Sequence, residues 1–106
     1  MGEHRRIEFE SLPFEPEAPG IASHAEELNG VRWAVVEYEP GVLREEWCLE
    51  GHSGYVLEGE VTYEFENGDE PLRVSAGEGL LLPDGAGHRG RAGDSGARLF
   101  LIDRAG

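Results

Sequence analysis

The chain has 106 residues and a formal net charge of −13, from 22 acidic residues against 9 arginines and no lysine. A protein of this length has room for one domain with a real hydrophobic core. Its acidic surface repels the phosphates of nucleic acids and anionic membranes, so we expect neither as a partner. The lack of lysine also excludes Schiff-base catalysis and a P-loop.

The sequence gives no reason to expect a targeting signal or a membrane anchor. The single cysteine, Cys48, cannot form an intramolecular disulfide. No apolar run approaches the roughly 18 residues that cross a bilayer, and residues 1–10 lack the apolar core of a signal peptide. We therefore expect a cytoplasmic protein, in which a lone thiol stays reduced.

Residues 1–20 are expected to form an extended arm, ahead of a barrel core at 31–102, within a single domain that spans 1–106. The apolar side chain of Phe14 in this arm has to be covered by another part of the protein. Arms of this kind suit packing across a neighbouring subunit, so we expect a homodimer. Regular structure in the arm is interrupted by Pro13, Pro16 and Pro19.

The remainder of the chain reads as about eight short strands separated by turn residues. The clearest strand is 60–66, in which apolar and polar side chains alternate. One helical turn is expected at 24–28, ending at an Asn-Gly pair. This spacing of strands, with sixteen glycines, favours an all-β closed barrel or jelly roll. Runs of β-branched and aromatic residues predict further strands at 31–39, 42–48, 52–58, 72–76, 80–82 and 98–102.

Side chains able to bind a metal gather around two turns. The segment 47–60, WCLEGHSGYVLEGE, places Cys48 and His52 four residues apart at the start of an apolar run. His88 follows a second turn-rich segment. A thiolate and two imidazoles suit Zn²⁺, Fe²⁺, Ni²⁺ or Co²⁺, and Glu46 would add an oxygen from the strand face of Cys48. Three protein ligands leave one position open for water or substrate.

The same residues also have a purely structural interpretation. A lone cysteine is usually a small buried apolar group, and an arbitrary Cys-x₃-His pair is more often packed than metal-bound. We likewise expect Trp33, Tyr38 and Tyr63 to pack in the barrel wall. A serine hydrolase is rejected, because the segment 51–54 has the wrong glycine spacing for a nucleophile elbow.

The turn-rich segment before the second histidine resembles the second motif of the cupin superfamily. That motif reads Gly, five residues, Pro-x-Gly, two residues, His. It is matched by Gly77, Pro83, Gly85 and His88, while Ala92 stands at the usual closing asparagine. The resemblance covers 31–102 and implies a cupin-type double-stranded β-helix, or jelly-roll barrel.

The first cupin motif, His-x-His, three or four residues, Glu, six residues, Gly, is altered in this chain. Counting back from Gly59, its glutamate falls on His52 and its two histidines fall on Glu46 and Cys48. Counting forward from the preceding turn gives instead Trp47 and Leu49. The resemblance is to a small single-domain cupin with the signature W-C-x-x-G-H-x-G-Y-V-L-E-G-E.

A cupin fold does not fix the reaction. We expect a divalent transition metal at Cys48, His52, His88 and Glu46, and a small-molecule ligand. The ion would act as a Lewis acid in a dioxygenase or in an isomerase or epimerase, with Glu46 or a histidine moving protons. The alternative is a non-catalytic small-ligand-binding or sensor cupin without metal.

Overall fold

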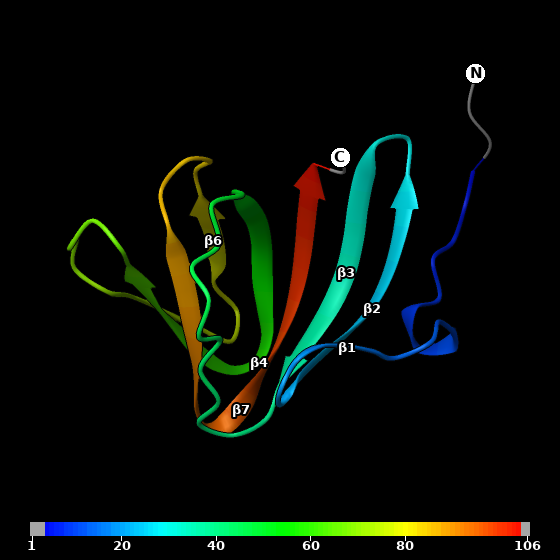
Figure 1. The fold of residues 1–106 in the computed structure, drawn as a ribbon. Helices are drawn as coiled ribbons and strands as arrows, with labels where there is room; N and C mark the ends of the chain where they lie inside the picture. The colour runs from blue at the N-terminus through cyan, green and yellow to red at the C-terminus, as the bar shows by residue number, and fades with distance from the viewer. Residues whose placement is uncertain (1–3, 105–106) are drawn as a thin grey trace.

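The computed structural model describes residues 4–104, and their regular secondary structure is almost entirely β-strand (Figure 1). The strands form one seven-stranded sheet in the order β1-β2-β3-β7-β4-β5, with β6 also paired to β4. A single 3₁₀ turn, Phe9–Ser11, precedes them. The all-β prediction is therefore confirmed. The strands are β1 (Glu15–Ala18), β2 (Ile21–Leu28), β3 (Val31–Tyr38), β4 (His52–Phe65), β5 (Leu72–Ser75), β6 (Gly79–Leu82) and β7 (His88–Arg104).

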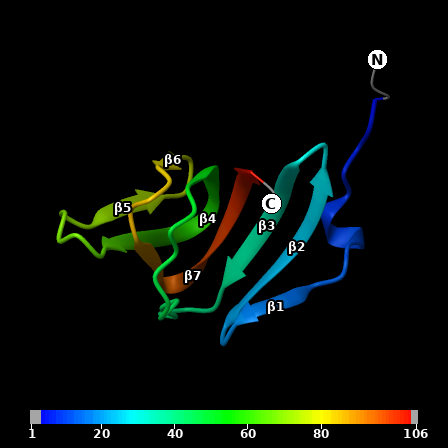
Figure 2. The ribbon, with the colours of Figure 1, turned by 45° about the horizontal axis from the view of Figure 1, so that its top comes forward.

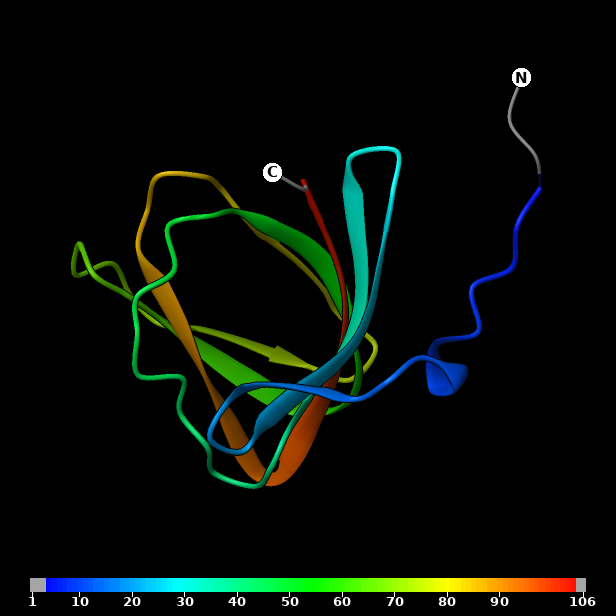
Figure 3. The same ribbon diagram turned by 45° about the vertical axis from the view of Figure 1, so that its right-hand side comes forward.

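The two longest strands, β4 and β7, roll the sheet into an open barrel (Figure 3). They pair along most of their length, and the register shifts at two places next to Glu58 and Gly59. Gly59 has a φ of 72°, and a β-carbon there would collide with the carbonyl oxygen of Gly96. Only glycine fits this position, and the irregular pairing bends both strands so that each contributes to two sides of the barrel.

The inner face of the barrel is apolar at its centre. Burying each valine or leucine side chain there stabilises the fold by about 1.5–3 kcal/mol relative to exposure. Buried residues alternate with less buried ones over 88–92 and 97–101 of β7 and over 61–63 of β4, as expected for strands with one face toward the core, whereas three consecutive residues of β3, 34–36, are buried. The largest cluster of buried apolar residues includes Ile21, Val36, Val56, Val61, Val74, Leu80, Leu82, Leu99 and Leu101.

The helical turn expected at 24–28 is wrong, because these residues lie in β2. β2 pairs with β3 along its whole length, from Ile21 opposite Tyr38 to Leu28 opposite Val31. The Asn-Gly pair after β2 has positive φ angles of 51° and 78°, which is the geometry of a tight hairpin turn. Pairing with a neighbouring strand has therefore overridden the local helical signal.

The strand expected at 42–48 is also wrong. This segment crosses from β3 to β4 without regular pairing (Figure 1). It contacts the sheet through two isolated bridges, Leu43 opposite Arg91 and Cys48 opposite His88. Residues without a continuous partner strand do not keep strict alternation, so side chains two positions apart need not share a face.

The N-terminal arm is partly incorporated into the sheet. β1 lies on the outer edge of the sheet beside β2 (Figure 2), and its register shifts between Pro16 and Ala18. Phe14 stays 49% exposed and stacks on the ring of His24, with 4.4 Å between the ring centroids. The homodimer that we expected from this arm stays a prediction, as does the cytoplasmic location. Among residues 4–104, no helix has the length and apolarity to cross a membrane.

Candidate metal centre

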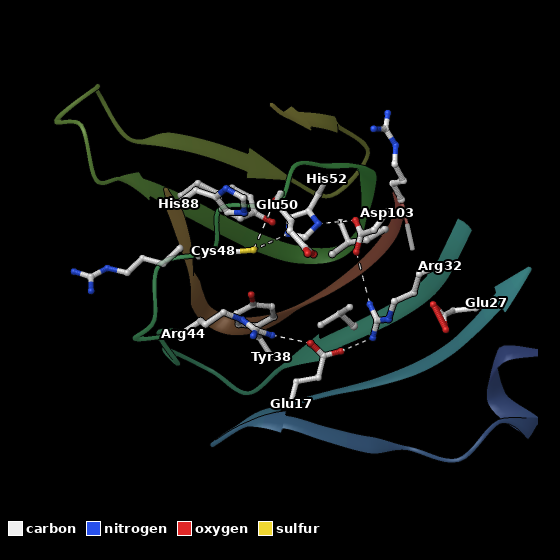
Figure 4. Close-up of a pocket in the computed structure, with 16 residues that line it drawn as sticks. Glu17, Glu27, Arg32, Tyr38, Arg44, Cys48, Glu50, His52, His88 and Asp103 are labelled. Carbon is white, nitrogen blue, oxygen red and sulfur yellow. Dashed lines mark hydrogen bonds and ion pairs between the residues drawn. The ribbon is translucent and has the colours of Figure 1, made fainter. Parts of the chain in front are cut away.

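Cys48 and His88 are held directly opposite each other by their backbones. The Cys48 N–H donates to the His88 carbonyl at 2.8 Å, and the His88 N–H donates to the Cys48 carbonyl at 2.9 Å. His52, the first residue of β4, completes the group. One potential ligand atom from each of the three side chains lies within 4.8 Å of the other two (Figure 4). We call these three residues the ligand group.

The turn of the second motif anchors the segment that carries Cys48. The Gly51 N–H donates to Asp84 Oδ1 at 2.7 Å, and the Gly85 N–H donates to the Leu49 carbonyl at 2.8 Å. A β-carbon on Gly51 would collide with the carbonyl oxygen of Leu82. The two segments that resemble the cupin motifs therefore meet in space, and glycine is required where they touch.

His52 is oriented by a carboxylate on the last strand. Its Nδ1 lies 2.5 Å from Asp103 Oδ1, and its Nε2 lies 3.7 Å from Cys48 Sγ (Figure 4). A carboxylate accepts a hydrogen bond, so Nδ1 carries a proton, and in a neutral ring the lone pair of Nε2 then faces the thiol. This arrangement of carboxylate, imidazole and free ring nitrogen is common around protein-bound metals.

His88 presents a free nitrogen in a buried position. The residue is 3% exposed, its Nδ1 lies 3.4 Å from the Ala86 carbonyl, and its Nε2 has no hydrogen-bond partner within residues 4–104. Burial and the nearby His52 ring lower the pKa of His88, so the ring is neutral. A buried polar atom without a partner costs free energy, and this cost is removed when a ligand occupies the position.

The ligand group lines a cavity of about 300 Å³, which is at the lower end of the range for small-molecule sites. Tyr38 and Tyr63 from the barrel wall also line it. Burial raises the pKa of both phenols, so they stay protonated and can donate hydrogen bonds.

Across the cavity from the ligand group, Glu17 from β1 sits between two arginines (Figure 4). Its carboxylate oxygens lie 2.9 Å from Arg32 Nη2 and 2.8 Å from Arg44 Nη2. Burial raises the pKa of Glu17, but hydrogen bonds from Ser23, Arg32 and Arg44 outweigh this effect and hold the pKa below its usual value.

Glu46, expected as a fourth ligand, is not part of the group. It is exposed and lines a different depression, together with Leu43 and Arg91. Its predicted position depended on a strand at 42–48, and without that strand Glu46 and Cys48 do not share a face.

Sequence reasoning missed Asp103, Arg32 and Glu17. Asp103 follows the last apolar run and reads as part of a charged tail, while Glu17 lies among the prolines of the arm. Neither position carries a local signal of function. Strand pairing brings both to the cavity: Asp103 on β7 lies opposite Arg32 on β3, and Glu17 is carried by β1, which pairs with β2.

Residues 25–98 match the EutQ-like cupin domain family, so the chain belongs to this family of cupins. The predicted cupin resemblance is thereby confirmed. No curated protein sequence matches the chain significantly.

Solved structures with a similar fold are also cupins. An oxalate decarboxylase variant from Bacillus subtilis superimposes with a TM-score of 0.79 at 19% identity, covering 100% of this chain and 31% of that one. An RmlC-like cupin from Shewanella frigidimarina gives 0.78 at 17% identity, covering 99% and 93%. A protein of unknown function from Rhizobium leguminosarum gives 0.81 at 19% identity, covering 99% and 100%. The chain therefore has the cupin jelly-roll fold and spans about a third of the decarboxylase.

Proposed function

We propose that this cupin binds one divalent transition metal ion through Cys48, His52 and His88. The observation that carries the proposal is the buried His88, whose Nε2 has no partner among the described residues and whose ring supplies one of three potential ligand atoms within 4.8 Å of one another. A tetrahedral ion with bonds of about 2.0–2.3 Å separates its ligand atoms by about 3.3–3.8 Å. The 3.7 Å between Cys48 Sγ and His52 Nε2 agrees with that spacing.

The chemistry of the donors narrows the choice of metal. The Bacillus subtilis oxalate decarboxylase has Mn(II) centres. A thiolate with two imidazoles is a softer set, which favours Zn²⁺, Fe²⁺, Co²⁺ or Ni²⁺ over Mn²⁺. Such an ion would supply a Lewis acid and an open coordination position.

The residues around the ligand group are suited to binding a small molecule. Asp103 fixes the His52 ring through Nδ1, while Tyr38 and Tyr63 offer phenolic donors inside the cavity. Val36 and Leu101 provide apolar contact area. We therefore propose a metal-dependent enzyme that acts on a small metabolite, as a dioxygenase or an isomerase or epimerase. Glu46 has no part in this chemistry, because it lines another depression.

Metal analysis of protein purified without chelator tests the site. We expect about one transition metal ion per chain in the wild type, and loss of that ion in Cys48→Ser, His52→Ala and His88→Ala. Glu46→Gln is the matched control, since it alters an exposed residue of the same segment and should retain the metal. Retention of the ion in a Cys48→Ala/His52→Ala variant would contradict the proposal.

The second candidate function is a non-catalytic small-ligand-binding or sensor protein. It is favoured by the donor set, because no carboxylate of residues 4–104 joins Cys48, His52 and His88 as a further potential ligand. A metal-free protein that is stabilised by metabolites in a thermal-shift screen, through binding to the folded state, would support it. Oxygen consumption or isomerisation by the metal-loaded protein would instead support the enzyme.

A further inference from the structure

The carboxylate of Glu17 occupies a two-arginine clamp inside the cavity. Each of its oxygens contacts a different guanidinium, at 2.9 Å for Arg32 and 2.8 Å for Arg44. Planar guanidinium groups recognise carboxylates through directed, charge-assisted hydrogen bonds. In a chain with a net charge of −13, two arginines converging in one small cavity form a local anion site.

Glu17 reaches this clamp through an irregularity in β1. The register of β1 against β2 shifts between Pro16 and Ala18, so Glu17 is the extra residue of a β-bulge. Bulges at sheet edges redirect a side chain. The Glu17 side chain is only 22% exposed, although the residue as a whole is exposed, because the side chain turns into the cavity (Figure 4).

The strand that carries Glu17 is weakly held. β1 has four residues, contains a proline and pairs with β2 alone. A short edge strand of this kind opens at a lower free-energy cost than a central strand. Glu17 can therefore leave the clamp without disturbing the core of the barrel.

The clamp is connected to the ligand group by a continuous series of polar contacts. Arg32 Nη1 lies 3.7 Å from Asp103 Oδ2, and the other oxygen of Asp103 binds His52 (Figure 4). Arg44, the second arginine, is close enough to Tyr38 for the two side chains to interact electrostatically, and both line the cavity. An anion held in the clamp would lie in the same cavity as the ligand group.

We infer that the cavity takes a small carboxylate ligand, whose carboxylate replaces that of Glu17 between Arg32 and Arg44. The inference rests on the proposed function in that it names the ligand class of the same cavity. Glu17 then acts as an internal competitor. The apparent affinity for the ligand equals the intrinsic affinity multiplied by the fraction of time in which Glu17 leaves the clamp free. A purely structural role for Glu17, tying β1 to the barrel, predicts no such competition.

Acetate, with acetamide as its uncharged analogue, serves as the probe in a ¹H–¹⁵N NMR titration of the full chain, with and without one equivalent of Zn²⁺. We expect Glu17→Gln to bind acetate at least about tenfold more tightly than the wild type. Glu15→Gln is the matched control, because it removes the same charge from β1 and Glu15 makes no ion pair within residues 4–104. It should bind acetate like the wild type.

Arginine variants locate the bound anion. Glu17→Gln/Arg44→Gln should lose the gain in affinity, and Glu17→Gln/Arg44→Lys, which keeps the charge, should lose most of it because lysine lacks the planar fork. Equal acetate affinity in Glu17→Gln and Glu15→Gln, or an equal gain for acetamide, would overturn the inference.

The metal content of the same samples is measured separately, and it tests the proposed metal site. Metal content should be unchanged in Glu17→Gln, because Glu17 is not in the ligand group. If no variant contains metal but the acetate response depends on Glu17 and Arg44, the metal proposal fails and the carboxylate inference holds. If metal is bound and Glu17→Gln gains no acetate affinity, the reverse applies.

Discussion

Cys48 and His88 form a bridge of two backbone hydrogen bonds between an irregular segment and the start of β7. This bridge places a thiol and a buried imidazole on the same wall of the cavity, although 39 residues separate them in the chain. His52 joins them because β4 begins immediately after the turn that anchors this segment. The ligand group is therefore positioned by backbone pairing, and side-chain packing alone does not account for it.

Asp103→Asn should weaken metal binding by about 10–100-fold, the usual effect of removing a carboxylate that orients a ligating histidine. Asparagine can still bond to His52, but it removes the charge that fixes the Nδ1–H tautomer and that pairs with Arg32. Competition with a fluorescent zinc chelator gives the affinity.

Asp94→Asn is the control for the change in charge. Asp94 lies on the same strand, is exposed and forms no ion pair within the described part of the chain. It should leave metal affinity unchanged. An equal loss in both variants would show that net charge, and not the contact with His52, is responsible.

Gly51→Ala should lower the free energy of unfolding by about 1–3 kcal/mol, the usual cost of forcing extra atoms into a packed site. The added β-carbon meets the backbone of β6 and of the turn after it, which cannot give way as a flexible side chain would. Urea denaturation measures the loss. Gly79→Ala, whose β-carbon would lie 3.4 Å from its nearest neighbour, should be tolerated much better.

The sequence allowed good prediction of strands with strict alternation, and of the proximity of Cys48, His52 and His88. Residues 60–66 bury Val61 and Tyr63 as their pattern indicates. Cys48, His52 and His88 were identified because their residue types and spacing are unusual in an otherwise acidic chain. These features are local, so they can be read without knowing which strands pair.

Features that depend on distant partners could not be predicted in the same way. Residues 24–28 became a strand because β3 lies beside them, and 42–48 lost its strand because no continuous partner is available. Glu17 and Asp103 are 86 positions apart in the chain. In the cavity the side chain of Arg32, on β3, forms an ion pair with each of them. Their roles follow from the sheet order, which the local pattern does not encode.

Metal-free protein should lose stability as the pH falls below about 6.5, through His88. Its pKa in the folded chain lies below the ordinary value of 6.5. Between the folded pKa and 6.5, His88 is protonated in the unfolded chain but not in the folded one. The free energy of unfolding therefore falls by up to about 1.4 kcal/mol for each pH unit of acidification in this window. Above pH 6.5 the His88 ring is neutral in both the folded and the unfolded chain, so its contribution to stability does not vary with pH.

Urea denaturation at pH 7.5, 6.5 and 5.5 checks this slope. His88→Gln should show a shallower decline than the wild type, while His4→Gln, at an exposed position, should follow the wild type. Parallel curves for the wild type and His88→Gln would rule out His88 as the origin of the pH dependence.

The contribution of Glu17 to stability should also depend on pH, but at more acidic pH than that of His88. Its folded pKa lies below the ordinary value of 4.5, so its contribution is complete above pH 4.5 and is lost as the pH falls through the folded pKa. We expect Glu17→Gln to cost about 1 kcal/mol at pH 7, because its hydrogen bonds to Arg32 and Arg44 are charge-assisted but partly exposed.

Denaturation of Glu17→Gln and wild type at pH 7 and pH 3.5 measures this difference, which should shrink at the lower pH. Glu15→Gln on the same strand should differ little from the wild type at either pH, since Glu15 has no ion pair between residues 4 and 104. A cost for Glu17→Gln that is the same at both pH values would mean that the side chain stabilises β1 through packing. The carboxylate would then have no role in holding the arm against the barrel.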